Sequence, residues 1–140
     1  MPEGEVPKFL VHVICGPDGA NPDRIPINKG RIDANGETME NIREVACANR
    51  EIVNGTCDGD VGNTGNVADA SFTNTNGRAV LAAHWNDPEF DAEHSAFYYV
   101  GVIGTPTLRW ATYDANFFNF EMHERTMMQL QKRVETSPIW

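Results

Sequence analysis

The sequence predicts a mainly β fold, an antiparallel sandwich-like β domain with one C-terminal helix. Two observations predict the sheets: hydrophobic residues alternate with polar ones over several segments, and three Asn-Gly dipeptides interrupt that alternation. Alternation buries one face of each strand, and Asn-Gly is a strong hairpin signal because both residues tolerate positive φ. The helix is predicted by residues that recur at every fourth position late in the chain. Because 140 residues is the size of one domain, we expect residues 1–140 to form a single β-rich domain.

The first strand and the first hairpin are predicted from local patterns. Residues 9–15 alternate between the two faces of a strand and lead into the turn-forming run Gly16-Pro17-Asp18-Gly19. A two-residue turn at Asn35-Gly36 predicts an antiparallel ribbon with matched cross-strand partners. The expected partners are Ala34 with Glu37, Ile32 with Met39, and Arg31 with Glu40. A helix over residues 38–48 is the alternative, because apolar residues there also fall at helical spacing.

A second hairpin is predicted around Asn76-Gly77, with one apolar face and one mixed face. On the apolar face the expected pairs are Phe72 with Leu81, Ala70 with Ala83, and Ala68 with Trp85. On the mixed face they are Thr73 with Val80, Ser71 with Ala82, and Asp69 with His84. Residues 96–103 are apolar or aromatic on both faces, which predicts a central strand. The helix is expected over about residues 121–134, where the recurring residues are Met122, Thr126, Leu130 and Val134.

Composition and charge argue against several kinds of partner. Twenty acidic residues against eleven basic ones give a net charge of −9, so we expect no nucleic acid partner. No stretch approaches the roughly 18 consecutive apolar residues of a membrane-spanning helix, so we expect no membrane span.

The first residues lack the positive and apolar regions of a secretory signal. The localisation is therefore left open, and an exported native protein is compatible with this sequence.

The chain has three cysteines, too few for a zinc ribbon or a scaffold of several disulfides. Cys47 and Cys57 flank a polar, turn-rich stretch, and a disulfide between them would stabilise the fold by about 2.5–3 kcal/mol in the chain-entropy model. Such a bond requires an oxidising compartment, and two reduced thiols are the alternative. Cys15 shares a strand face with Phe9 and Val11, so we interpret it as a small buried hydrophobic residue.

Four residues around the end of a predicted strand carry the donor atoms of a metal site. They are His84, Asp87, Asp91 and His94. Imidazoles and carboxylates together could ligate a transition metal if this loop folded back on itself. Their spacing matches no established site, and a strand end followed by turns is the simpler interpretation.

A second cation hypothesis concerns Asp58, Asp60 and Asn63, which resemble the start of an oxygen-rich calcium loop. An EF-hand loop needs glycine where Asn63 stands and a bidentate glutamate where Asp69 stands, so an ordinary turn-rich loop is favoured. We expect no cofactor, and a divalent cation at one of these two places is the alternative.

Aromatic residues offer another kind of site. The Trp and Tyr residues are numerous enough to line a carbohydrate or peptide groove, and the candidates are Trp85, Tyr98, Tyr99 and Trp110. Aromatic residues in small β domains are more often packing residues, which is the alternative. No nucleophile elbow, phosphate-binding loop or dinucleotide fingerprint occurs in the sequence. We therefore assign no catalytic residues, and we do not expect the isolated chain to be an enzyme.

Motifs along nearly the whole chain carry a family resemblance. They include Gly16-Pro17-Asp18-Gly19-Ala20-Asn21-Pro22-Asp23, Trp85-Asn86-Asp87-Pro88-Glu89-Phe90-Asp91, Ala96-Phe97-Tyr98-Tyr99-Val100, Pro106-Thr107-Leu108-Arg109-Trp110 and Thr136-Ser137-Pro138-Ile139-Trp140. In this order they resemble the C-terminal region of a bacterial family known as domain of unknown function 3604. Longer members of that family have an upstream part similar to metal-dependent phosphoesterases of the polymerase-and-histidinol-phosphatase superfamily. The proposed metal ligands lie in that upstream part, and no residue here matches them.

The resemblance implies a structural or accessory C-terminal module of a metal-dependent hydrolase-like protein, inactive alone, with an upstream catalytic domain as its partner. A module separated from such a partner exposes an apolar patch, so we expect the isolated chain to form a homo-oligomer. The alternative is a small ligand- or cation-binding protein that uses an aromatic groove or the loop from Asp58 to Asn63.

Overall fold

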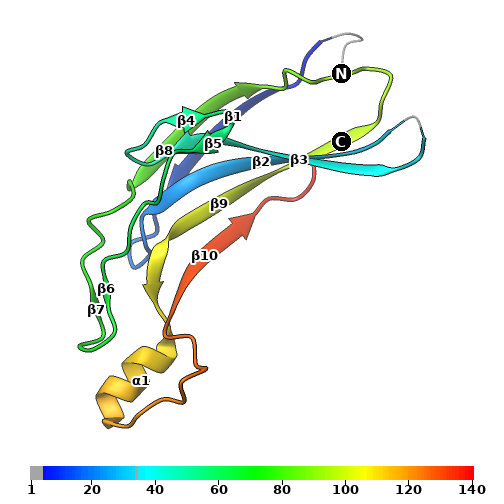
Figure 1. Cartoon of the computed structure of the whole chain (residues 1–140). Helices are drawn as coiled ribbons and strands as arrows, with labels where there is room; N and C mark the ends of the chain where they lie inside the picture. The colour runs from blue at the N-terminus through cyan, green and yellow to red at the C-terminus, as the bar shows by residue number, and fades with distance from the viewer. Residues whose placement is uncertain (1–4, 34) are drawn as a thin grey trace.

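Figure 1 shows the computed structural model of the chain, which describes residues 5–33 and 35–140. The fold is mainly β with antiparallel sheets, and α1 (Trp110–Phe118) is the one helix among the described residues. The predicted fold class is therefore confirmed. The central sheet has four strands in the order β10-β9-β2-β3. Their bounds are β2 Pro22–Ile32, β3 Thr38–Cys47, β9 Ala96–Leu108 and β10 Gln129–Glu135.

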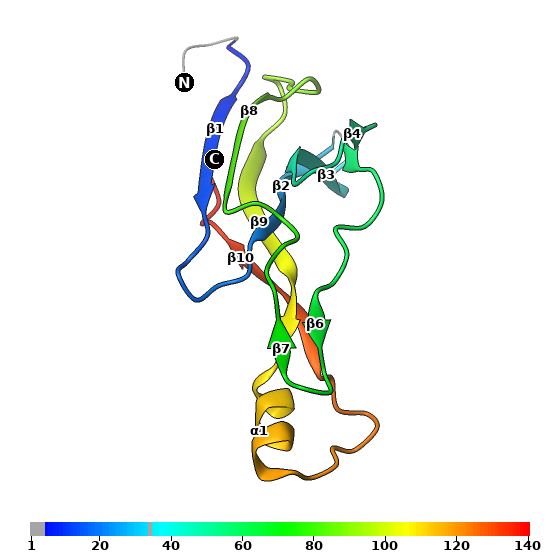
Figure 2. The ribbon, with the colours of Figure 1, turned by 90° about the vertical axis from the view of Figure 1, so that its left-hand side faces the viewer.

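A second, two-stranded sheet covers one face of the central sheet. It consists of β1 (Lys8–Ile14) and β8 (Val80–Asn86), which run antiparallel beside each other (Figure 2). Two short hairpins lie in the connection between β3 and β8. They are β4 (Ile52–Val53) with β5 (Thr56–Cys57), and β6 (Gly65–Asn66) with β7 (Ser71–Phe72). The first of them turns at Asn54-Gly55, where both residues have positive φ as that dipeptide predicts.

The hydrophobic core lies between these two sheets because alternate residues of each strand point toward the other sheet. Its buried hydrophobic residues are Ile25, Ile27, Ala46, Ala48, Leu81, Ala83, Tyr98 and Val100. Phe9 of β1 packs on Tyr98 with ring centroids 5.0 Å apart. Leu10 and Ile14 of the same strand point the other way and are exposed. The opposite face of the central sheet is not covered by β1 and β8, and it carries the pocket described below.

The sequence correctly predicts strands at residues 9–15 and 96–103. Strand β9 is central, because it pairs with β2 on one side and with β10 on the other. An inner strand of a sheet meets neighbours on both edges, which suits its continuous run of apolar and aromatic residues. Its length and position make β9 the element that supports the pocket.

The predicted hairpin around Asn76-Gly77 is wrong. Strand β8 pairs with β1, so that Leu81 lies opposite Val13 and Trp85 opposite Phe9. The predicted pairs that do not form are Phe72 with Leu81, Ala70 with Ala83, Ala68 with Trp85, Thr73 with Val80, Ser71 with Ala82, and Asp69 with His84. Strand β7 pairs with β6 instead.

The reason is that the segment before Gly77 is held as a loop. The side-chain amide of Asn21 donates to the backbone oxygens of Asn74 and Asn76 at 2.9 and 3.0 Å. Ala70 has φ of 54°, a left-handed conformation that ends the extended backbone. Gly77 has φ of 75° and lies against the Pro22 carbonyl, where a Cβ would come within 2.7 Å. These long-range contacts outweigh the local hairpin signal.

The ribbon around Asn35-Gly36 forms, but its register differs by one residue from the prediction. Ile32 pairs with Thr38 rather than Met39, and Arg31 pairs with Met39 rather than Glu40. The predicted Ala34 with Glu37 pair lies outside the described residues.

The shift in register follows from the side chain of Asp33. Its Oδ1 accepts hydrogen bonds of 2.9 Å from the backbone N–H groups of Asn35 and Glu37. The Asp33 N–H also donates to the Glu37 carbonyl, so the turn is longer than two residues. The alternative helix over residues 38–48 does not form, because most of that segment is strand β3.

The helix lies earlier in the chain than the predicted range of 121–134. Residues Gln129–Glu135 of that range form strand β10. A spacing of four residues fits the period of two of a strand as well as the period of 3.6 of a helix, which explains the error. Helix α1 shows no periodic spacing of buried hydrophobic residues, because its large residues are exposed and only Ala111 and Thr112 are buried. It ends at Asn119, which adopts the left-handed conformation common at helix C-termini.

No helix in residues 5–33 and 35–140 is long and apolar enough to cross a membrane.

Candidate ligand-binding site

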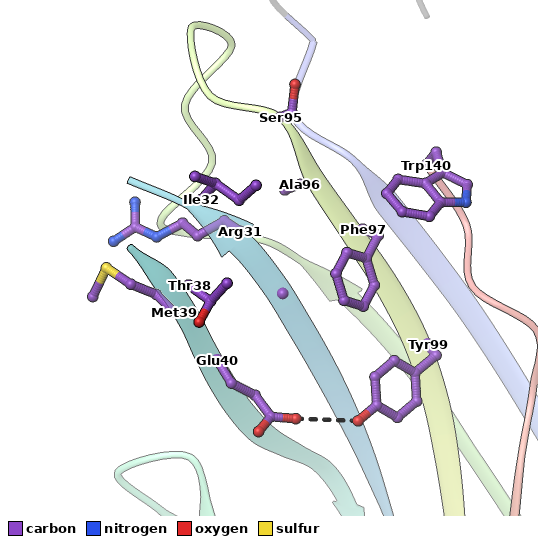
Figure 3. A pocket seen from close by; sticks show the side chains of 11 residues that line it. Arg31, Ile32, Thr38, Met39, Glu40, Ser95, Ala96, Phe97, Tyr99 and Trp140 are labelled. Atoms are coloured by element: carbon purple, nitrogen blue, oxygen red, sulfur yellow. Dashed lines mark hydrogen bonds between the residues drawn. The ribbon is translucent and has the colours of Figure 1, made fainter. Parts of the chain in front are cut away.

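A pocket of about 460 Å³ opens on the face of the central sheet that β1 and β8 leave uncovered. It lies beside the turn between β2 and β3, and strands β2, β3 and β9 supply its lining together with Trp140 near the end of the chain (Figure 3). The residues that give it its character are Ile32, Met39, Glu40, Phe97, Tyr99 and Trp140. The volume falls in the range of about 300–1,000 Å³ that is usual for small-molecule sites.

The floor of the pocket depends on Gly30. This residue pairs directly with Phe97 across the sheet, and a Cβ at Gly30 would overlap the tip of the Phe97 ring. The missing side chain lets the ring reach from β9 across β2. Glycine within a strand often marks such a close approach.

Phe97 and Tyr99 form a flat aromatic surface. They stand two residues apart on β9, so they project from the same face of the sheet. Their ring planes differ by only 14° and their centroids lie 6.4 Å apart, so the rings are nearly parallel, and Figure 3 shows them beside each other along β9. Figure 3 shows both rings reaching from β9 toward β2 and β3. We call this pair the aromatic platform.

The Tyr99 hydroxyl fixes the outer end of the platform. It donates a hydrogen bond of 3.1 Å to the Glu40 carboxylate on β3. Partial burial, that hydrogen bond and the negative charge of Glu40 all raise the pKa of Tyr99 above its ordinary value. The phenol therefore stays protonated at neutral pH and remains a hydrogen-bond donor to Glu40.

Trp140 forms a wall beside the platform. Its ring centroid lies 5.1 Å from that of Phe97, with the planes inclined by 46°. The preceding residue Ile139 exchanges two backbone hydrogen bonds with Tyr98, of 2.7 and 2.8 Å. This bridge holds the backbone next to Trp140 beside β9, and 84% of Trp140 is exposed.

A buried polar cluster supports β9 and β2 from the opposite face. The Lys29 ammonium donates to the Asp87 carboxylate at 2.5 Å and to the Glu89 carbonyl at 2.7 Å. The Tyr98 hydroxyl donates to the same Asp87 oxygen at 2.7 Å. Lys29, Asp87 and Tyr98 are all buried. The cluster ties the segment after β8 to the two strands that carry the pocket.

The pKa values of this cluster follow from burial and from the three hydrogen bonds that Asp87 accepts, from Lys29, Tyr98 and the Glu89 backbone N–H. Burial raises the pKa of Asp87, but these three hydrogen bonds and the Lys29 charge outweigh it, so the pKa lies below its ordinary value. Burial and the adjacent Asp87 carboxylate raise the pKa of Tyr98. Asp87 is therefore ionised and Tyr98 protonated at neutral pH, which is the arrangement that their hydrogen bond requires.

The structure does not bring the four predicted aromatic residues into one groove. Tyr99 lines the pocket, whereas Tyr98 is buried on the opposite face. Trp85 packs beside Phe9 at the core, with ring centroids 5.7 Å apart. Trp110 begins α1 and lies at the other end of the molecule.

Sequence reasoning missed Phe97, Trp140 and Glu40 as pocket residues. The signal that could have found Phe97 is the spacing of Phe97 and Tyr99, which puts two rings on one face of a strand. The place of Trp140 depends on the bridge between Ile139 and Tyr98, which no local pattern indicates.

The first predicted group of metal ligands is also dispersed. His84 is exposed on β8, and Asp87 is buried against Lys29. Asp91 and His94 share an exposed hydrogen bond of 2.9 Å between Oδ2 and Nδ1. That contact closes a turn after Asp87 and does not involve His84.

In the predicted calcium loop, side-chain oxygens accept hydrogen bonds from backbone N–H groups two residues further along the chain. Asp60 accepts the backbone N–H of Gly62 at 3.1 Å, and Asn63 accepts that of Gly65 at 2.8 Å. Asp58 and Asp60 are exposed. These contacts are those of an ordinary turn-rich loop.

Cys47 and Cys57 are joined by a disulfide, with Cα atoms 5.8 Å apart. Among the described residues, they and Glu44 are the one set of three or more metal-binding side chains whose donor atoms lie within 4.8 Å of one another. Both sulfurs are used by the disulfide, and Glu44 pairs with Arg24 at 2.7 Å. In this oxidised form the set has no thiolate for a metal. The third cysteine, Cys15, is half-buried and unpaired.

The described residues form a mainly β fold with an aromatic pocket on one sheet face. The model of the family described as "Protein of unknown function (DUF3604)" matches residues 1–140. The chain belongs to this family. The comparisons with curated proteins and with solved structures found no match.

Proposed function

We propose that this chain is an accessory module that packs against a separate domain through the end of the molecule formed by α1. We call this the α1 end and define it as residues 110–128. The partner that we propose is the metal-dependent hydrolase-like domain implied by the family resemblance. In this role the chain stabilises or borders that domain and has no catalytic residues of its own.

The observation that carries this proposal is the apolar character of the α1 end. Six large hydrophobic residues there are exposed, namely Trp110, Tyr113, Phe117, Phe118, Phe120 and Met127. Phe117 and Phe118 contact each other edge to face, with centroids 4.9 Å apart, yet 82% of Phe117 is exposed. Soluble proteins rarely expose contiguous apolar groups of this kind unless they form an interface.

The α1 end is also anchored to the central sheet, as a docking surface requires. The N–H of Arg109, just before α1, donates to the Met128 carbonyl at 2.9 Å. The Thr112 hydroxyl donates to the same carbonyl. Because β9 leads into α1 and β10 follows Met128, both sides of this projection continue directly into the sheet (Figure 1). A partner that binds the α1 end would therefore be held at a fixed orientation to the sheet.

The isolated chain tests this proposal through its own association, because an uncovered docking surface promotes self-association. We expect sedimentation velocity to show dimers or larger species as concentration rises, and mainly monomer for the double variant Phe117→Ser, Phe118→Ser. The matched control is Leu10→Ser, which removes an equally exposed hydrophobic residue from β1. It should associate as the wild type does. A wild type that stays monomeric over a wide concentration range, or a control that loses association equally, contradicts the proposal.

A further inference from the structure

We propose that the pocket binds a neutral saccharide, with one sugar ring stacked on the aromatic platform and Trp140 against its edge. This inference does not rest on the docking role of the α1 end, because the two surfaces share no residue.

The geometry of the platform is the first argument. A pyranose with equatorial hydroxyl groups presents a flat face of C–H bonds, which packs well on the π face of an aromatic ring. Phe97 and Tyr99 offer two nearly parallel rings side by side, inclined by 14°. The surface is thus broad and flat rather than a narrow slot, and it suits a ring-shaped ligand with an apolar face.

The polar groups around the platform are the second argument. Glu40, Arg31 and Ser95 line the same pocket as the aromatic rings. A sugar carries hydroxyl groups around its edge, and these both donate and accept hydrogen bonds. The carboxylate accepts, the guanidinium donates and the serine hydroxyl does either. An apolar floor with a few polar groups at its margin matches this distribution on the ligand.

Charge selects a neutral saccharide over an acidic one. The chain carries a net charge of −9, which disfavours the approach of a polyanion. At the pocket itself Glu40 and Arg31 bring one charge of each sign. A neutral β-linked polysaccharide, in which successive rings are flat and equatorially linked, fits these conditions best.

The platform and the wall are held in place before any ligand binds. Phe97 and Tyr99 belong to a central strand, Tyr99 is bonded to Glu40, and Trp140 follows the backbone bridge at Ile139. Aromatic side chains have few rotatable bonds, so little conformational entropy is lost when they contact a ligand. The pocket lies near the turn between β2 and β3, whereas α1 lies at the far end of the sheet (Figure 1). A sugar and a protein partner can therefore be bound together.

Affinity gel electrophoresis of the full chain tests this proposal. The gels contain mixed-linkage β-glucan, xylan or galactomannan as neutral probes, and alginate as the anionic probe. We expect slower migration in at least one neutral gel. The variants Trp140→Ala and Tyr99→Ala should migrate there as they do without polysaccharide. Trp110→Ala is the matched control, because it removes another exposed tryptophan, at the α1 end, and should be slowed as the wild type is.

The outcomes separate this proposal from the docking role. No slowing of the wild type by any neutral probe overturns the saccharide site and leaves the association experiment unaffected. Slowing by alginate alone overturns the choice of a neutral ligand. Slowing that survives in both pocket variants, or that is lost in Trp110→Ala, places the contact outside the pocket and also overturns the proposal. Circular dichroism of each variant shows that a lost shift is not a loss of folding.

Discussion

Both ends of this molecule expose aromatic residues, but the backbone supports them differently. At the pocket end, which comprises the pocket-lining residues of β2, β3 and β9 together with Trp140, the rings of Phe97 and Tyr99 lie across neighbouring strands. At the α1 end, Phe118 contacts Phe117 and Phe120, and this aromatic group lies at the end of a short helix. The first arrangement is a shaped surface for a small ligand, and the second is an apolar projection suited to a larger partner.

The difference teaches that aromatic content alone does not define a site. What distinguishes the pocket end is what lies beside and beneath its rings: Gly30, which makes room for Phe97, and the hydrogen bond that fixes Tyr99. The buried Lys29 and Asp87 hold the other face of the same strands. Changes at the pocket end should therefore alter the stability of the fold, whereas changes at the α1 end should alter association alone.

The largest effect is expected for Lys29→Ala, which leaves the buried Asp87 carboxylate without its counter-charge. Breaking a buried ion pair from one side costs about 3–5 kcal/mol, so the free energy of unfolding should fall by that amount in urea denaturation. Arg43→Ala is the control, because Arg43 pairs with Glu89 at 2.7 Å near the surface. Its loss should cost less than about 1 kcal/mol. Equal decreases in unfolding free energy for both variants would mean that the buried ion pair stabilises the fold no more than the surface pair does.

A smaller effect is expected for Gly30→Ala at the floor of the pocket. The added methyl group overlaps the Phe97 ring, and overpacking of this kind costs about 1–3 kcal/mol of unfolding free energy. Gly16→Ala is the matched control, since a Cβ at Gly16 meets no atom within 4 Å. The comparison with the α1 end is Phe117→Ser, which should change the unfolding free energy by less than about 0.5 kcal/mol. If Gly30→Ala lowers the unfolding free energy as little as Gly16→Ala and Phe117→Ser do, the position of the Phe97 ring does not depend on Gly30.

The smallest effect is expected in the acid dependence of stability. The pKa of Asp87 is lowered in the folded protein from an ordinary value of 3.8. A carboxyl group with a lowered folded pKa contributes stability above its unfolded pKa and loses it as pH falls toward the folded pKa. The unfolding free energy of the wild type should therefore decrease as pH falls below about 4. Asp87→Asn should show a shallower decrease there, and an unchanged slope would contradict the assignment of the ion pair.

The sequence predicts which segments form strands better than it predicts which strands pair with each other. A run of apolar and aromatic residues locates the strand around residues 96–103, and because this run covers both faces it correctly predicts a central strand. The pairing of β8 with β1 is not predicted, because Asn21 fixes a loop at Asn74 and Asn76 through contacts distant in sequence. Local turn signals cannot show which strand a distant segment will join.

The same limit applies to the two candidate surfaces. Tyr99 is found as a candidate from its residue type, but its platform with Phe97 requires the face of β9 to be known. Trp110 is placed at the α1 end, because the helix begins there rather than at residue 121. A short helix whose large residues are mostly exposed leaves no amphipathic pattern to detect.

The measurement that tests this account most directly applies both assays to the same two variants. Sedimentation velocity and affinity electrophoresis are carried out on Trp140→Ala and on Phe117→Ser, Phe118→Ser. We expect Trp140→Ala to lose retardation by neutral polysaccharide and to self-associate as the wild type does. The α1 variant should keep retardation and become mainly monomeric. If either variant changes both properties together, the two ends do not act as separate surfaces, and the account is contradicted.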